Sequence, residues 1–482
     1  MTSNGDPVLP GPVAKAAGGP TIVPQRRETT GRRRLRDRVA RALVARLLGS
    51  LHDGALAITE RGERQVFGEP VDGLPIPEIT VRSPSAWTAV ATGGSGGLGR
   101  GFFSGWWGVD DLDDLVLAVR VIIRNLDSTE LPQRVAHRLL APVLWVRVRF
   151  LERLGRRAAD RRNISAHYDL GNEFFSLFLD ETMTYSCALF DSADTSLHEA
   201  QVAKLDRLCR KLQLGASDHV LEIGTGWGGF AIHAAREYGC RVTTTTLSLR
   251  QFELATEKVA RAGLADQVTV LYRDYRDLVG SYDKLVSIEM IEAVDWRQYP
   301  RFFAKCAQLL KPDGLMALQA IVIADRYFDR AKQSRDFVKR YIFPGGCLPS
   351  AAAILGTTAR TSDLELMALD DIGPHYAETL RRWRAGLEAR ASELAALGLD
   401  ETFRLLFDFY LCYCEAAFVE RRISDVQCLF ARRSWRADRL AAPPADGGIR
   451  GNRPVGSSPP TSSAPASAGG PSAPDPGARA SE

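Results

Sequence analysis

A glycine-rich loop that follows an apolar strand is the feature that most constrains this chain. The segment Val220–Gly229 reads VLEIGTGWGG, so a short apolar run with one acid leads directly into closely spaced glycines. Glycine adopts positive φ angles without steric cost and lets the backbone approach a ligand closely. In open α/β sheets, ligands bind beyond the carboxyl ends of the strands. The loop therefore predicts a nucleotide-like ligand at the start of an α/β fold.

Strand and helix patterns alternate from residue 219 onward. Such alternation predicts a mostly parallel sheet that is covered by helices on both faces. The expected strands are Val220–Ile223, Arg241–Thr246, Val268–Tyr272, Lys284–Ile288, Leu315–Ile323 and Val426–Phe430. The expected helices are Gly229–Tyr238, Leu249–Ala262, Tyr299–Leu310, Tyr376–Leu397 and Glu401–Arg421.

The positions of the acids separate two ligand classes. Enzymes that bind NAD or FAD carry a similar glycine pattern and usually place an acid at the end of the second strand. Here the second strand ends in Thr244, Thr245 and Thr246, whereas Glu222 ends the first strand and Asp274 follows the third. Asp274 can accept a hydrogen bond from an adenine amino group. This arrangement resembles a class I methyltransferase that uses S-adenosylmethionine.

The remainder of the chain predicts a smaller unit and two polar ends. Residues 1–31 and 441–482 are expected to be disordered, because their composition cannot bury enough apolar surface to fold. Residues 32–162 predict an N-terminal α+β domain, and residues 163–440 the catalytic domain. Expected elements of the N-terminal domain are strands at Ala55–Thr59 and Glu78–Val81 and helices at Leu112–Asn125 and Ala136–Leu154.

An amphipathic helix is expected to open the N-terminal domain. Leu35, Val39, Leu43 and Leu47 recur at four-residue spacing among many arginines. Such a helix suits an anionic lipid surface, although a solvated helix packed on protein has the same pattern. A second arginine cluster lies between residues 147 and 162.

Composition excludes several classes of protein. The net charge of +4 is too small to indicate a nucleic-acid partner. The cysteines are scattered without a CxxC pair, so we expect no metal site and a reducing, cytoplasmic setting. No apolar run reaches the roughly 18 residues of a membrane-spanning helix.

Further motifs stand in order along the chain. They are HYDLGN at His167–Asn172, MTYSCA at Met183–Ala188, SIEMIEAV at Ser287–Val294, YIFPGGCLPS at Tyr341–Ser350, IGPHYAETL at Ile372–Leu380 and FYLCYCEAAF at Phe409–Phe418. Together these motifs resemble the cyclopropane-fatty-acyl-phospholipid synthase family over about residues 45–435. GFFSGWW at Gly101–Trp107 also resembles the lipid-facing N-terminal domain of those enzymes. The resemblance implies a Rossmann-like class I methyltransferase domain with a mostly parallel seven-stranded sheet.

The resemblance also implies a reaction and its setting. A methyl group passes from S-adenosylmethionine to a cis double bond of an unsaturated phospholipid chain, a carbocation forms, and loss of a proton closes a cyclopropane ring. A bound bicarbonate ion is the implied base. The enzyme would work at the inner face of a membrane as a peripheral protein, and a homodimer is left open.

Carried over by motif, the resemblance implies a set of catalytic residues. Glu292 is the expected glutamate, with Glu289 as the competing choice. Cys187 could equally be a small core residue and Tyr376 a buried structural tyrosine. The residues implied to hold bicarbonate are Cys187, Glu292, Gln319, Ile321 and Tyr376.

Gln319 departs from the family pattern, which has a histidine at this position. Glutamine can donate to and accept from an anion, but it does not titrate near neutral pH. We therefore interpret Gln319 as a subfamily feature that leaves a second product open. In that alternative, the proton is lost without ring closure and the acyl chain gains a methylene branch.

The cofactor residues combine the loop with neighbouring motifs. Thr246 and Gln251 are expected to bond ribose hydroxyls in place of the missing acid. The full set is Tyr185, Ser186, Glu222, Gly224, Gly226, Thr246, Gln251, Asp274 and Tyr275. Aromatic candidates for the lining of a dry carbocation site are Tyr168, Phe174, Phe175, Phe178 and Tyr341.

Overall fold

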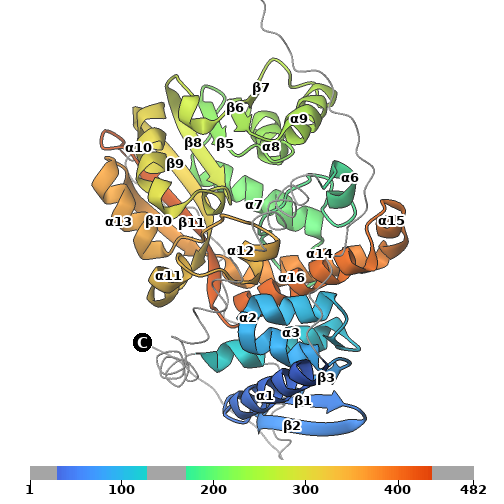
Figure 1. Ribbon diagram of the computed structural model, residues 1–482. Helices are drawn as coiled ribbons and strands as arrows, with labels where there is room; N and C mark the ends of the chain where they lie inside the picture. The colour runs from blue at the N-terminus through green and yellow to red at the C-terminus, as the bar shows by residue number, and fades with distance from the viewer. Residues whose placement is uncertain (1–29, 127–169, 437–482) are drawn as a thin grey trace, which may run out of the picture. The chain divides into compact units, whose positions relative to one another are not determined.

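The computed structural model describes residues 30–126 and 170–436 (Figure 1). The predicted helix at Ala136–Leu154, the second arginine cluster, Tyr168 and nearly all of the two polar ends lie outside the described residues. The elements before residue 127 are α1 (Thr30–Leu48), β1 (Gly54–Glu60), β2 (Glu63–Glu69), β3 (Glu78–Val81), α2 (Ser85–Phe103), β4 (Trp107–Gly108) and α3 (Leu112–Arg124).

A four-stranded sheet organises this N-terminal part, with strand order β2-β1-β3-β4. β1 and β2 form an antiparallel hairpin whose last pair is Glu60 and Glu63. The two turn residues, Arg61 and Gly62, both have positive φ angles, at 56° and 85°. Turns of this kind match the twist of the flanking strands, so this short connection fixes the register of the hairpin.

The elements after residue 169 form the larger part of the described chain. Its helices are α6 (Asn172–Phe175), α7 (Leu197–Lys211), α8 (Gly229–Tyr238), α9 (Leu249–Arg261), α10 (Tyr299–Leu309), α11 (Asp325–Ala331), α12 (Phe337–Tyr341), α13 (Ala351–Thr361), α14 (Gly373–Ala389), α15 (Ala391–Ala396) and α16 (Glu401–Val419). Its strands are β5 (His219–Ile223), β6 (Arg241–Thr246), β7 (Val268–Tyr272), β8 (Tyr282–Ile288), β9 (Leu310–Ile323), β10 (Glu365–Asp371) and β11 (Ile423–Ala431).

These strands form one seven-stranded sheet with the order β10-β11-β9-β8-β5-β6-β7. All of the pairs from β7 to β9 are parallel, and β11 runs antiparallel to both β9 and β10. This is the mostly parallel sheet that the sequence predicts, so the fold class is confirmed. The carboxyl ends of β5 and β8, which are neighbours, meet at one edge of the sheet.

Alternate residues of the central strands feed two cores on opposite faces of the sheet. Leu221 and Ile223 of β5 pack in a cluster with Phe302 and Phe303 of α10. Val220 packs in a different cluster that includes side chains of α7 and α8. Because side chains alternate across a strand, a continuous apolar strand such as β5 must be covered on both faces.

The N-terminal part packs on the C-terminal part through α16, which contacts both α2 and α3. The glycines of α2 allow this approach: a Cβ atom at Gly99 would lie 2.3 Å from the ring of Phe337. Glu420, directly after α16, accepts from Arg120 at 2.7 Å and from Arg124 at 2.9 Å. No helix among the described residues is long and apolar enough to cross a membrane.

The structure matches several predicted elements to the residue, among them β6, β7, α8 and β3. Several elements were not predicted, among them β2, α2, α7, α13 and β10. α2 has the sequence SAWTAVATGGSGGLGRGFF, and its six glycines disfavour a helix, so tertiary packing stabilises it instead. The predicted helix at Tyr376–Leu397 is divided into α14 and α15 near Arg390.

Candidate active site

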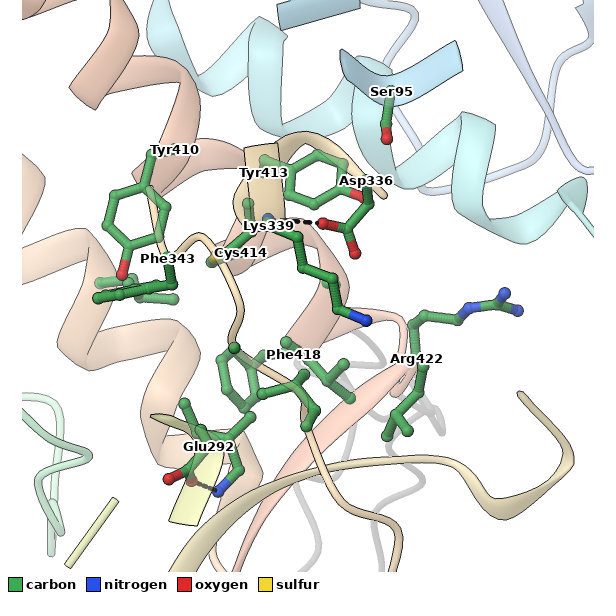
Figure 2. A pocket seen from close by; sticks show the side chains of 18 of the residues that line it. Ser95, Glu292, Asp336, Lys339, Phe343, Tyr410, Tyr413, Cys414, Phe418 and Arg422 are labelled. Carbon is green, nitrogen blue, oxygen red and sulfur yellow. Dashed lines mark hydrogen bonds between the residues drawn. The ribbon is translucent and has the colours of Figure 1, made fainter. Parts of the chain in front are cut away.

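A cavity of about 1890 Å³ runs between the N-terminal helices and the carboxyl edge of the large sheet. Its wall includes Leu43 and Leu47 of α1, Ile122 of α3 and the glycine loop after β5. In Figure 2, the aromatic side chains of Phe343, Tyr410, Tyr413 and Phe418 lie in the same pocket as Glu292. The cavity therefore joins an apolar channel to the predicted cofactor loop.

The cofactor loop, Gly224–Gly229, has the geometry of a ligand-binding turn. Gly224, Gly226 and Gly228 have φ angles of 106°, 52° and 86°. A Cβ atom at Gly226 would meet no described atom within 4 Å, whereas one at Gly224 would lie 3.2 Å from Met290. Both Gly224 and Gly226 line the cavity. The loop thus leaves open space at the edge of the sheet, directly before α8.

Glu222 lies at the end of β5 and faces the same space. It is 2% exposed and lines the cavity, and its Oε2 atom finds no hydrogen-bond partner among the described residues. Burial raises the pKa of Glu222 to about 8. A buried polar atom without a partner is costly, and a ligand hydroxyl or amino group would satisfy it.

Tyr185 and Ser186 approach the cavity from the segment before α7. The Tyr185 ring stacks on Trp383 with centroids 4.9 Å apart, and its hydroxyl lies 3.0 Å from that of Tyr410. The Ser186 hydroxyl accepts a hydrogen bond of 2.6 Å from Lys204, whose side chain is fully buried. Burial lowers the pKa of Lys204, and the charge of Glu289 acts in the opposite direction.

The remaining predicted cofactor residues differ in their access to the cavity. Gln251 lines it and accepts a hydrogen bond of 2.8 Å from the Thr246 hydroxyl. Thr246, Asp274 and Tyr275 are not among the residues that line it. The Asp274 carboxylate instead accepts from the side chain and the backbone of Arg276, which lowers its pKa.

Three acidic side chains gather where β8, β9 and β11 lie side by side, and we call Glu289, Glu292 and Asp425 the carboxylate cluster. Glu289 is its centre, directly after β8. Its Oε1 atom accepts from the Cys187 backbone N–H and from the Gln319 amide, each at 2.8 Å. Its Oε2 atom accepts from the Tyr376 hydroxyl at 2.7 Å.

Glu292 lies next to Glu289 in the carboxylate cluster, and one of its two carboxylate oxygens accepts a hydrogen bond. Its Oε1 atom accepts from the Ile321 backbone N–H at 2.5 Å, and its Oε2 atom has no partner among the described residues. Burial first, and then the charge of Glu289, raise the pKa of Glu292 to about 8. Glu292, Ile321 and Tyr376 all line the cavity together with Glu289.

Gln319 and Cys187 lie behind this wall and are both fully buried. Gln319 donates to Asp425 at 2.8 Å as well as to Glu289, and its oxygen accepts from Gln427 at 3.0 Å. Burial raises the pKa of the Cys187 thiol well above its usual range, and the thiol points to backbone carbonyls. Cys187 therefore contributes its backbone N–H to the site and not a thiolate.

The structure brings all five predicted catalytic residues together, but it gives their donors a different partner. Cys187, Gln319 and Tyr376 donate to the Glu289 carboxylate, and the Ile321 N–H donates to Glu292. The donors expected to hold a bicarbonate ion are thus occupied by two carboxylates of the chain itself. A further anion does not fit among these groups as they stand.

The aromatic residues predicted to line the carbocation site differ in their access to the cavity. Phe175 lines the cavity, while Phe174 and Phe178 pack in the core against Phe407. Tyr341 packs against Phe103, with ring centroids 5.3 Å apart.

Within the described residues, one grouping has atoms close enough to hold a metal ion. It consists of Asp180, Glu181 and His198, whose ligand atoms lie within 4.8 Å of one another. None of the three lines the cavity, and exposed acidic groups often lie close together without an ion.

Lys204 and Asp425 are among the residues of the site that were not identified from the sequence. Lys204 lies in α7, in LHEAQVAKLDRLCRK, and its only signal is its place on the buried face of an amphipathic helix. Asp425 interrupts the apolar strand ISDVQCLFA, and an acid at a buried strand position is the clearer signal.

The glycine loop, the strand order and the cavity define this protein as an S-adenosylmethionine-dependent methyltransferase of class I. The sequence matches the family described as mycolic acid cyclopropane synthetase over residues 156–428, and the chain belongs to this family. The resemblance inferred from the sequence motifs is therefore confirmed.

The alignments with curated relatives cover most of each relative's length. The chain is 40% identical over 350 residues to the tuberculostearic acid methyltransferase UfaA1 of Mycobacterium tuberculosis, covering 71% of this chain and 80% of the relative. It is 35% identical over 369 residues to the cyclopropane-fatty-acyl-phospholipid synthase of Escherichia coli K12, covering 76% of this chain and 90% of the relative.

Solved structures agree with this assignment. The mycolic acid cyclopropane synthase CmaA1, complexed with SAH and CTAB, is 32% identical with a TM-score of 0.52. The match covers 56% of this chain and 97% of that protein.

Proposed function

We propose that this enzyme transfers a methyl group from S-adenosylmethionine to the cis double bond of an unsaturated phospholipid acyl chain and closes a cyclopropane ring. The observation that carries the proposal is the single cavity that joins the cofactor loop, the carboxylate cluster and an apolar channel. The similarity to a tuberculostearic acid methyltransferase and to a cyclopropane-fatty-acyl-phospholipid synthase supports a lipid substrate.

The cofactor would be held by groups that the cavity leaves available. Gly224 and Gly226 let it approach the backbone, and Glu222 offers an unpartnered carboxyl oxygen. Tyr185, Ser186 and Gln251 line the same space. S-adenosylmethionine supplies an electrophilic methyl group on a sulfonium sulfur. The chain's own task is then to align the alkene, exclude water and remove a proton.

The walls of the cavity suit a cationic intermediate on the lipid. Water would quench a carbocation, so the reacting carbons must lie among apolar and aromatic groups. Tyr376, Phe418, Phe343 and Tyr410 line this region. Tyr376 and Phe418 stack with ring centroids 4.3 Å apart, which holds one aromatic face in place. Aromatic faces attract cations.

The base at this site was expected to be bicarbonate, as the family resemblance implies. The donors assigned to that ion are already bonded to Glu289 and Glu292. We therefore assign no step to bicarbonate in this protein.

A methylene-branched chain is the second candidate product. It shares the methyl transfer and differs only in how the positive charge is removed. The identity of 40% to a tuberculostearic acid methyltransferase favours it, as does Gln319 in place of the family histidine.

Helix α1 supports a membrane partner for the enzyme. Its apolar residues Leu35, Val39 and Leu43 are 63%, 61% and 47% exposed. Arg36 and Arg38 are exposed on the same helix. Leu43 also lines the cavity, so the exposed stripe leads to the channel. An apolar stripe beside arginines binds the surface of an anionic bilayer, and we place the enzyme at the inner face of the membrane in the cytoplasm.

Incubation with labelled S-adenosylmethionine and vesicles of a monounsaturated phospholipid tests the proposed function. Mass spectrometry with chemical derivatisation then separates a cyclopropane from a methylene branch of equal mass. We expect label in the acyl chain as a cyclopropane. Label in the headgroup, or no transfer from an enzyme that binds S-adenosylmethionine, contradicts the proposal.

A triple variant, Leu35→Ser, Val39→Ser and Leu43→Ser, tests the membrane surface. Loss of this apolar area should weaken binding to anionic vesicles at least about tenfold in sedimentation assays. The matched control changes three other exposed apolar residues, Val279, Leu366 and Leu397, to Ser. Equal binding by both variants and the wild type would remove α1 from the membrane surface.

A further inference from the structure

We propose that Glu289 is the general base of this enzyme, a carboxylate fixed in the chain at the place where a separate anion was expected. The inference rests on the proposed function, because a base is needed only if a lipid cation forms. It goes further, since it replaces a diffusible co-reactant with a residue. It also predicts that turnover does not depend on bicarbonate.

The first observation is the set of donors around Glu289. A backbone N–H from Cys187, an amide from Gln319 and a hydroxyl from Tyr376 come from three separate segments of the chain and converge on one carboxylate. An ionised carboxylate accepts hydrogen bonds only and offers about four acceptor positions. Three donors therefore orient the group and leave Oε2 with capacity for a proton.

The second observation is the backbone of Glu289. Its φ angle is 48°, in the left-handed region that residues with a Cβ atom rarely adopt. Its own N–H donates to the Gln319 carbonyl at 2.9 Å, which continues the pairing of β8 with β9. Strained conformations persist where the surrounding structure holds them, and they gather at functional sites. Here the conformation carries the carboxylate from the end of β8 to the cavity wall.

The third observation is access and charge. Glu289 lines the cavity together with Glu222 of the cofactor loop, whereas its donors Cys187 and Gln319 do not. The fully buried Lys204 ammonium lies close enough for its charge to interact with Glu289 and Asp425. Lys204 also bonds Ser186 at the cofactor side. One buried cation thus compensates negative charge in the carboxylate cluster.

The proton-transfer step balances without any added reagent. After methyl transfer, one former alkene carbon carries the new methyl group and its neighbour carries the positive charge. Glu289 takes a proton from that methyl group, and the released C–H electron pair forms the second C–C bond, which closes the ring and cancels the charge. In the branched outcome, a hydride shift first moves the charge to the substituted carbon, and the same electron pair forms a C=C bond. Glu289 holds the proton as a carboxylic acid until it is released to water.

A pair of substitutions tests this assignment. Glu289→Gly removes the carboxylate and leaves the three donors facing a space of anion size. It also removes the backbone strain, because glycine adopts a positive φ angle without steric cost. Glu289→Gln removes the base but keeps the space filled. Both variants should lose about 10²- to 10⁴-fold in kcat, the range of general-base catalysis. Added formate or bicarbonate should restore part of the Glu289→Gly activity and none of the Glu289→Gln activity.

Binding of formate provides a readout that does not depend on turnover. Formate should raise the Tm of Glu289→Gly by a few degrees and leave the wild type and Glu289→Gln unchanged. Calorimetry with S-adenosylmethionine confirms that each variant is folded. Glu257→Gln, on the exposed face of α9, is the matched control and should behave as the wild type.

The outcomes separate this assignment from the proposed function. If the wild type modifies the acyl chain and Glu289→Gln retains more than about one tenth of its kcat, Glu289 is not the base. If Glu289→Gly is inactive, folded and neither rescued nor stabilised by formate, the carboxylate has a structural role and the assignment fails. If the wild type binds S-adenosylmethionine but modifies no acyl chain, the proposed function itself fails, and the assignment fails with it.

Discussion

The carboxyl ends of β5 and β8 lie side by side at one edge of the same sheet. The acidic side chains at these two ends, Glu222 and Glu289, differ in their hydrogen-bond partners. After β5, the cofactor loop leaves Glu222 Oε2 without a partner among the described residues and keeps the space beside Gly226 open. After β8, Glu289 accepts three hydrogen bonds from groups that already surround it. Glu222 therefore has an oxygen left for a ligand, whereas the Glu289 carboxylate already has its donors in place.

This difference separates binding from chemistry within one cavity. Unpaired buried groups lose free energy that a ligand can restore, so the β5 edge should determine cofactor affinity. Donors that are already oriented need no reorganisation during the reaction, so the β8 edge should determine turnover. Substitutions at the two edges should therefore change different kinetic constants.

The largest effect is expected from a matched pair of carboxylate substitutions. Glu289→Gln should lower kcat by about 10²- to 10⁴-fold and change the Kd for S-adenosylmethionine by less than about threefold. Glu222→Gln should raise this Kd about tenfold with a small change in kcat, because an amide nitrogen cannot accept the hydrogen bond that the unpartnered carboxyl oxygen offers to a ligand. Calorimetry and steady-state kinetics measure both constants. If both variants change the same constant, the separation of cofactor binding from turnover between the two strand ends is wrong.

A smaller effect on kcat is expected from Tyr376→Phe. Phenylalanine keeps the stacked contact with Phe418 but removes the hydroxyl that donates to Glu289 Oε2. Burial raises the pKa of Tyr376 well above its usual range, so this hydroxyl stays protonated and remains a donor. We expect about a tenfold loss in kcat, the effect of one oriented hydrogen bond. An unchanged kcat would show that Tyr376 does not position the base.

A glycine pair sharpens the description of the β5 edge. Gly226 and Gly263 both have positive φ angles, 52° and 70°, and a Cβ atom at either would meet no described atom within 4 Å. Gly226→Ala and Gly263→Ala should therefore carry similar backbone strain of about 1 kcal/mol. Only Gly226 lines the cavity. Gly226→Ala alone should weaken S-adenosylmethionine binding, by about fivefold in calorimetry, and equal affinities would contradict a cofactor at this loop.

The smallest effect is a pH dependence of stability that both edges share. The pKa values of Glu222 and Glu292 are each raised to about 8 in the folded protein, from an ordinary 4.5. Between these values the folded state binds more protons than the unfolded state. The free energy of unfolding should therefore fall as the pH rises from about 5 to 8. Denaturant titrations should show a shallower fall for Glu222→Gln and for Glu292→Gln, and an unaltered fall for Glu257→Gln.

The large sheet could be predicted from the sequence because local pattern and burial agree there. The strand predicted at the β-branched run Arg241–Thr246 has the same bounds as β6. α8 also has its predicted bounds, with Gly228 and Gly239 directly before and after it. α2 could not be predicted, since its glycines oppose helix formation and only contacts with distant residues such as Phe337 and Phe409 explain them. β10, with several exposed side chains, carries little of the pattern of a buried strand.

The site residues were predicted by motif, but their connections were not. The motif SIEMIEAV offers two glutamates three residues apart, and the sequence cannot tell which of them receives the donors of Cys187, Gln319 and Tyr376. That depends on the left-handed backbone at Glu289 and on the register of β8 against β9. Similarly, Asp274 bonds Arg276, two residues further on, and a local pair of this kind is not visible in a strand pattern.

The dependence of wild-type turnover on bicarbonate tests the central claim most directly. The enzyme would be assayed with monounsaturated phospholipid vesicles in buffer stripped of carbon dioxide, and then with increasing bicarbonate at constant pH and ionic strength. A base fixed in the chain predicts the same kcat throughout, within experimental error. A kcat that falls severalfold on depletion and returns with saturable dependence on bicarbonate would contradict Glu289 as the base.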